Sequence, residues 1–205
     1  MSYTYNPIYT HFKGDDMTRC EIVERAVVEA ILKSKMVDDK RAWSKTFELK
    51  HSSSVTQFGR VLAQKRGLSP ELSAIICALH DIYVFTTGRV TDHAHKGAPI
   101  ARKILEKTKK FTEAEIKLIT SAIYNHSDKH IVGKNPYVEL VKDADVFDCG
   151  LYDGVHDAYI YEKSQDTCKK YFSRIKAVRK ELGLPKDSQW DRLDYVERGK
   201  EFYKK

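Results

Sequence analysis

Apolar residues recur every three or four positions along most of the chain, which is the period of an amphipathic α-helix. One clear segment places Val55, Phe58 and Leu62 on the same stripe as His51, so we expect this histidine to face the core. We find no segment in which apolar and polar residues alternate as in a half-buried strand. The pattern therefore predicts an all-α protein with about eight helices.

Breaks in this pattern indicate where helices begin and end. Gly67 is expected to end the helix that carries His51, since glycine is common just after a helix. Thr112 and Glu115 have the spacing of a capping box that starts a later helix. The segment 82–92 contains the sequence Thr-Thr-Gly-Arg-Val, and we predict a loop there that is long enough to act as a lid.

The final part of the chain is more polar than the rest. From about residue 155 to residue 182 the periodicity predicts one long helix. The sequence Gly-Leu-Pro that follows should end this helix. A last helix is then predicted, with Trp190 and Val196 on its buried face.

Size and composition favour a single domain over residues 1–205. A chain of 205 residues, 41% of them hydrophobic, can form its own core. Its first residues lack the basic and apolar parts of a signal peptide. No apolar run approaches the roughly 18 residues that a membrane span needs. We therefore expect a cytoplasmic protein without a membrane partner.

The chain is basic, with a formal net charge of +7, which favours anionic partners such as phosphates, nucleotides or nucleic acid. Most of the excess lies in residues 163–205, where 13 Lys and Arg residues stand against 7 Asp and Glu residues. Charge in such a pattern usually forms a solvated helical face. Nucleic acid is therefore a less favoured partner than a small phosphorylated molecule.

His80 and Asp81 form the most informative pair, because they directly follow the apolar run 73–79. A helical bundle directs such side chains into a common pocket. Imidazole and carboxylate groups together suit Mn, Fe, Co, Ni or Zn better than Ca or Mg. Other residues of the same types stand beside other helical segments: His51, His95, His126 and Asp145.

The order of these groups resembles the HD-domain superfamily of metal-dependent phosphohydrolases. The resemblance rests on His51, on the pair His80-Asp81 and on Asp145 within the sequence Lys-Asp-Ala-Asp-Val-Phe-Asp. It implies that these four residues bind one divalent transition-metal ion. It also implies a single-domain helical bundle of the HD-domain type.

The similarity covers roughly residues 47–150, so residues 151–205 would form a basic helical extension. Asp143 and Asp148 are alternatives to Asp145 as the last ligand. Asp145 is preferred because the family motif places its ligand directly after an alanine.

A second part of the resemblance concerns family members that hold two ions. The sequence Asp-His-Ala-His-Lys-Gly-Ala resembles the His-x-x-Gly-Ala segment that follows the HD pair in these members. It implies His95 as a ligand of a second ion, together with His126 after Ile-Tyr-Asn. Asp81 would then bridge the two ions. His93 and His130 are alternatives to the two histidines.

The implied reaction is metal-assisted hydrolysis of a phosphomonoester or phosphoanhydride of a small molecule, with a nucleotide favoured. One or two ions would lower the pKa of water from about 16 towards about 7, and Asp81 would orient that water. The sequence departs from the family where Ile-Tyr-Val follows Asp81 in place of a glycine and a lysine, and where Val146 replaces a basic residue. Contact to phosphate is therefore assigned to other cations: Lys96 as a catalytic residue, and Arg60, Arg89 and Lys129 as substrate-binding residues.

Two other functions stay open at this point. A nuclease or cyclic-dinucleotide phosphodiesterase with two metal ions would need an open basic groove for its substrate. A non-catalytic module would bind a metal or a nucleotide without turnover, and the missing lysine would then reflect the lost activity.

Overall fold

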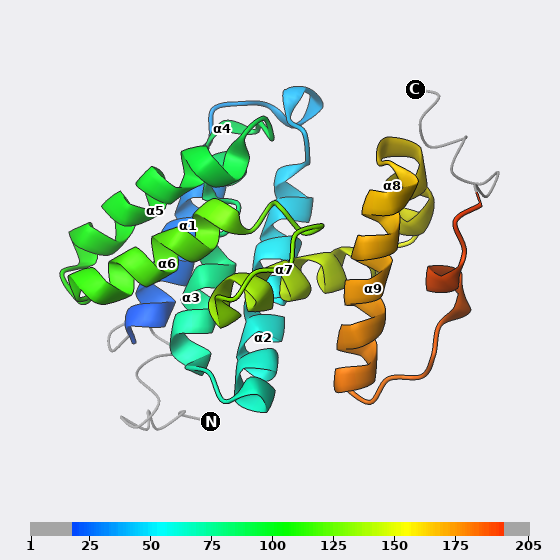
Figure 1. Ribbon diagram of the computed structural model, residues 1–205. Helices are drawn as coiled ribbons and strands as arrows, with labels where there is room; N and C mark the ends of the chain where they lie inside the picture. The colour runs from blue at the N-terminus through cyan, green and yellow to red at the C-terminus, as the bar shows by residue number, and fades with distance from the viewer. Residues whose placement is uncertain (1–17, 195–205) are drawn as a thin grey trace, which may run out of the picture.

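The computed structural model describes residues 18–194, which form helices and connecting segments without a strand (Figure 1). The all-α prediction is confirmed. Across these residues no helix is both long and apolar enough to cross a membrane. The helices are α1 (Arg19–Lys33), α2 (Lys45–Arg66), α3 (Pro70–Leu79), α4 (Ile82–Thr87), α5 (His93–Thr108), α6 (Glu113–Asn125), α7 (Pro136–Cys149), α8 (Val155–Glu162) and α9 (Gln165–Glu181), with 3₁₀ turns at Asp38–Lys40 and Ser188–Asp191.

The helix α3 lies at the centre of the main core. All of its residues from Ser73 to Leu79 are buried, and it packs against α1, α2, α6 and α7. The contact with α2 is close at Gly59, where an added Cβ would lie 2.6 Å from Cys77 Sγ. This approach explains why a glycine interrupts the stripe that begins at His51, and it brings α2 alongside the end of α3.

Two helix termini, the end of α2 and the start of α6, lie where the sequence predicted them. Gly67 adopts a left-handed conformation with φ of 65° and ends α2. Thr112 and Glu115 form the capping box that starts α6. Both features depend on residues close in sequence, which is why the chain alone reveals them.

The predicted loop at 82–92 is wrong in its first half, because Ile82–Thr87 forms α4. Ile82, Val84 and Phe85 are fully buried, and α4 packs against α1 and α5. The threonines and glycine that suggested a lid belong to the end of this helix. The helical path is interrupted at Asp81, with φ of −104° and ψ of 22°, so the His-Asp pair occupies the junction between α3 and α4.

The predicted long helix from 155 to 182 is also wrong, because it is divided into α8 and α9. Ser164 caps α9, and its Oγ accepts a hydrogen bond from Thr167 N at 3.3 Å. This capping signal interrupts a periodicity that is otherwise continuous. Of the predicted last helix, Trp190 lies in a 3₁₀ turn, and Val196 falls outside the described residues.

The helix α9 stands beside α7 at one side of the bundle (Figure 1). The two helices share a second, smaller core that also includes Trp190. Its buried members are Val146, Cys168, Tyr171, Phe172, Ile175 and Trp190. The segment after residue 150 therefore packs directly on the helix that carries Asp145.

Candidate metal centre

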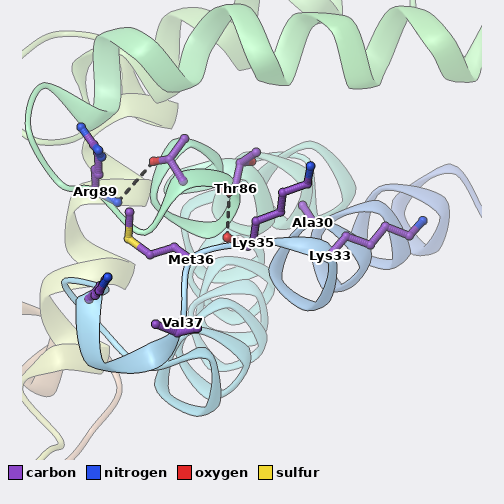
Figure 2. A pocket seen from close by; sticks show the side chains of 10 residues that line it. Ala30, Lys33, Lys35, Met36, Val37, Thr86 and Arg89 are labelled. Atoms are coloured by element: carbon purple, nitrogen blue, oxygen red, sulfur yellow. Dashed lines mark hydrogen bonds between the residues drawn. The ribbon is translucent and has the colours of Figure 1, made fainter.

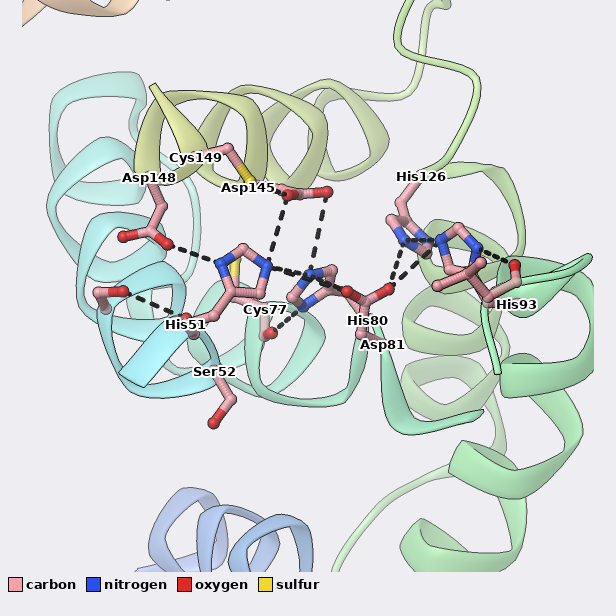
Figure 3. Close-up of polar contacts among 12 residues, drawn as sticks. His51, Ser52, Cys77, His80, Asp81, His93, His126, Asp145, Asp148 and Cys149 are labelled. Carbon is pink, nitrogen blue, oxygen red and sulfur yellow. Dashed lines mark hydrogen bonds and ion pairs between the residues drawn. The ribbon is translucent and has the colours of Figure 1, made fainter. Parts of the chain in front are cut away.

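Six histidine and aspartate side chains that can bind metals converge in the interior of the bundle (Figure 3). They come from α2, the α3–α4 junction, the start of α5, the end of α6, and α7. At most 7% of each side chain is exposed, except for His93 at 20%. The residues are His51, His80, Asp81, His93, His126 and Asp145.

The first group contains the four residues that the sequence predicted as ligands of one ion. His51 Nε2 lies 3.2 Å from His80 Nε2 and 3.5 Å from Asp145 Oδ1. Asp81 Oδ2 lies 3.2 Å from His80 Nε2 and 3.8 Å from His51 Nε2. The structure therefore places both carboxylates within 3.9 Å of the Nε2 atoms of His51 and His80.

The second group shares Asp81 with the first. Asp81 Oδ1 lies 3.3 Å from His93 Nε2 and 3.3 Å from His126 Nε2. These two imidazole nitrogens are 3.2 Å apart. Asp81 Oδ2 thus faces the first group and Asp81 Oδ1 faces the second. This is the geometry of a bridging carboxylate.

Backbone hydrogen bonds define the tautomer of three histidines. The Nδ1 atoms of His80, His93 and His126 each lie 2.7 to 2.9 Å from the carbonyl oxygen three residues earlier. Because a carbonyl only accepts, Nδ1 carries the hydrogen, and a neutral ring then has only a lone pair at Nε2. The facing Nε2 atoms of His93 and His126 therefore suit a cation held between them. This donor set fits a divalent transition metal.

Further polar contacts hold the ligands in place. His51 Nδ1 lies 2.6 Å from Asp148 Oδ2, a contact that orients the ring for binding through Nε2. Asp148, one alternative to Asp145, is therefore a partner of a ligand. The other alternative, Asp143, pairs instead with Arg66 and Arg174.

Burial and neighbouring charge have opposite effects on the two central histidines. Burial by itself lowers the pKa of His80, but the charges of Asp81 and Asp145 outweigh it and raise this pKa to about 9. For His126 burial prevails and lowers the pKa to about 4. Burial tends to raise the pKa of Asp81, yet the adjacent histidines hold it well below its usual range. Near neutral pH and without a metal, the raised pKa of His80 keeps this ring protonated beside an ionised Asp81.

Metal binding is expected to release this proton, because a histidine must be neutral to bind a metal. Since the pKa of His80 is raised to about 9, metal affinity should rise with pH, by up to about tenfold per pH unit below that value. Titration calorimetry in buffers of different ionisation enthalpy measures the protons released. A metal affinity that stays constant from acid pH to about pH 9, with no proton release, would contradict this prediction.

The structure places His95 outside the cluster, contrary to the prediction. Its Nδ1 pairs with Asp92 Oδ1 at 2.7 Å, its ring stacks on Tyr124, and 45% of its side chain is exposed. His93 takes the predicted place. Two residues apart on an α-helix differ by roughly 200° in direction, so only one of these histidines can face the cluster.

Two of the predicted phosphate-binding residues, Lys96 and Arg60, contact residues outside the cluster. Lys96 Nζ donates to Thr91 O at 3.1 Å and lies 5.4 Å from the centre of the Tyr83 ring. Arg60 pairs with Glu24 at 2.5 Å. Neither side chain shares a contact with the six residues of the cluster.

The other two predicted cations differ in position. Arg89 lines a separate hollow of about 800 Å³, to which Lys33, Lys35 and Lys40 also belong (Figure 2). Lys129 lies at the cluster, where its Nζ is 2.5 Å from Asp145 Oδ2. Of the four candidates, only Lys129 contacts a residue of the metal centre.

Cys149 lies at the site, although the sequence predicted no role for it there. Its Sγ lies 3.7 Å from Asp145 Oδ1, and it forms a possible ligand group with His51 and Asp145. Burial raises the pKa of this thiol well above its usual range. Its spacing of four residues from Asp145 on one helix was the signal that could have revealed it.

Comparison with known proteins points to the same part of the chain. The family model described as HD domain matches residues 49–150. That range includes every residue of the cluster. No curated protein and no solved structure gives a significant match.

Proposed function

The chain belongs to the HD-domain superfamily, and from this premise we propose that it is a metal-dependent phosphohydrolase acting on a small phosphorylated molecule, with a nucleotide favoured. The observation that carries the proposal is the position of the Asp81 carboxylate between two groups of imidazoles. Its two carboxylate oxygens face different histidine pairs. Carboxylate bridges of this kind serve two-metal hydrolytic sites.

Each residue of the cluster has a distinct part in the proposed reaction. His51, His80, Asp81 and Asp145 would hold one ion, and Asp81 with His93 and His126 would hold a second. When bound, a divalent ion polarises a phosphoryl oxygen and makes water more acidic. Asp81 orients the attacking water. Lys129 is the cation best placed to contact a phosphate oxygen, because it already reaches Asp145.

The depth of the cluster supports a small substrate. Among the six residues of the cluster, His93 is the most exposed, at 20% of its side chain, and the others are at most 7% exposed. A polymer would need an open basic groove over the metal site. The basic hollow lined by Lys33, Lys35, Lys40 and Arg89 includes none of the cluster residues. A small phosphate ester therefore fits better than a nucleic acid.

A substrate screen tests the proposal. Protein loaded with Mn²⁺, Co²⁺ or Ni²⁺ is assayed against nucleotides, dinucleoside polyphosphates and a generic phosphodiester, with chelator-treated protein as the control. Metal-dependent release of phosphate or of a nucleotide product would support it. Nucleotide binding without product after long incubation would instead support the non-catalytic module, and the hydrolase would be rejected.

The two histidines at the start of α5 provide a matched test of the second ion. Replacing His93 by alanine should remove about one of two bound ions per chain, because a ligand of the second group is lost. His95→Ala should leave the metal content unchanged, since His95 pairs with Asp92 outside the cluster. Elemental analysis after dialysis gives both numbers. Equal metal content in the two variants would show that His93 is no ligand.

A further inference from the structure

Arg174 on α9 donates two hydrogen bonds to the loop that carries Lys129 and two to α7. Arg174 Nε donates to Lys129 O at 2.6 Å, and its Nη2 donates to Ile131 O at 3.1 Å. The same guanidinium reaches Asp143 at 2.7 Å and Glu139 at 2.6 Å on α7. Arg174 is 9% exposed. The buried side chain of Arg174 therefore holds the α6–α7 loop, residues 126–135, against α7.

The side chain of Lys129 projects from this loop into the metal centre. Both members of its ion pair with Asp145 are largely buried, with exposed fractions of 11% and 7%. The ammonium group of Lys129 has three donors. Within residues 18–194, the hydrogen-bond acceptor that it contacts is Asp145. Its remaining donors are therefore free for an anion. Under the proposed function, this anion is a phosphate group of the substrate, bound beside the metal ions.

We propose that Arg174 is a positioning residue that holds Lys129 over the metal centre for contact with phosphate. The proposal rests on the proposed function for the nature of the anion. It assigns a role to the segment after residue 150, which lies beyond the matched HD domain. The ligands all precede this segment, yet α9 completes the site.

The geometry explains why an arginine stands at this position. Its four acceptors use all three guanidinium nitrogens, and the planar guanidinium supplies five donors in a fixed arrangement. A lysine retains the charge but cannot reach all of these acceptors at once. The loop also has support from α7, since Lys142 Nζ donates to Ile131 O and Gly133 N donates to Glu139. Loss of Arg174 should therefore loosen the segment around Lys129 without unfolding the whole loop.

Arg66 provides a matched control for Arg174. It also bridges α7 and α9, through Asp143 at 2.9 Å and Glu181 at 2.7 Å. It makes no contact with the carbonyl groups of the loop. Replacing either arginine by methionine removes an ion pair with Asp143, but only Arg174→Met releases Lys129.

The test compares full-length Arg174→Met, Arg66→Met and Lys129→Met proteins with the wild type. In chelator-treated protein, an amine-reactive reagent and mass spectrometry give the labelling rate of Lys129. In Mn²⁺-loaded protein, calorimetry gives the affinity for inorganic phosphate and, separately, for Mn²⁺. We expect Arg174→Met to increase the labelling of Lys129 severalfold and to weaken phosphate binding about tenfold. Lys129→Met should weaken phosphate binding to a similar degree without weakening Mn²⁺ binding.

The proposal is overturned if Arg174→Met and Arg66→Met give the same labelling rate and the same phosphate affinity. It is also overturned if Lys129→Met binds phosphate as the wild type does. Arg174→Lys, which retains the charge but loses the Nε donor, replaces Arg174→Met if the latter does not fold. Absence of turnover in the wild type would reject the proposed function alone, because labelling and phosphate binding do not depend on catalysis.

Discussion

Replacing Asp81 by asparagine is expected to abolish metal-dependent hydrolysis. Asparagine has nearly the same size, but it removes the negative charge that faces four imidazoles through two oxygens. Changes to residues that only orient a ligand cost roughly 10- to 100-fold in metal affinity or activity. Loss of the shared ligand should cost more, and we expect kcat/KM to fall by at least about 1000-fold, or about 4 kcal/mol.

The control for this variant is Asp92→Asn. Asp92 has a positive φ of 59°, which asparagine tolerates, and its carboxylate pairs with His95 outside the cluster. It should retain wild-type metal content and activity. Metal content and initial rates are measured for both proteins. An Asp81→Asn protein with full metal content and a wild-type rate would refute both the bridge and the proposed mechanism.

Replacing Glu48 by glutamine is expected to produce a large loss of stability. Glu48 and Arg41 form an ion pair in which both side chains are 0% exposed. Arg41 also donates to Ser34 Oγ and to the carbonyl groups of Val84 and Phe85. Removing one partner of a buried pair leaves an uncompensated charge and typically costs about 3–5 kcal/mol. Urea denaturation followed by circular dichroism measures the change in the free energy of unfolding.

Two further variants make this result interpretable. Glu29→Gln removes a carboxylate from the exposed pair with Lys33 and should leave the free energy of unfolding unchanged within error. The double variant Arg41→Met/Glu48→Leu removes both buried charges and should be less destabilised than the sum of the single changes. If Glu48→Gln were as stable as Glu29→Gln, the buried pair would not stabilise the contact between residues 34–44 and α4.

The four residues of the first group could be predicted to face the interior because each has a local signature. His51 lies on an apolar helical stripe, and His80 with Asp81 follows a run of buried residues. Asp145 lies four residues after Val141, which is buried. Positions on or beside an apolar stripe are expected to face the core. The resemblance to the HD-domain superfamily then identified them as a set.

The choice between His93 and His95 had no such signature. It depends on where α5 begins and how it is rotated, and Asp92 starts this helix without a side-chain capping bond. The position of Lys129 was equally hidden, because Arg174 from a distant helix sets the path of its loop. These features arise from contacts between residues 33 or more positions apart in the chain.

The resemblance to the HD-domain superfamily was needed to single out the four residues of the first group, whereas helical periodicity and helix caps were sufficient for the fold class. These properties depend on intervals of three or four residues, which the sequence displays directly. Packing in three dimensions was needed to form α4, to turn His93 inward and His95 outward, and to bring Lys129 to Asp145. Each of these outcomes depends on which helix surfaces meet, and that is a property of the whole folded chain.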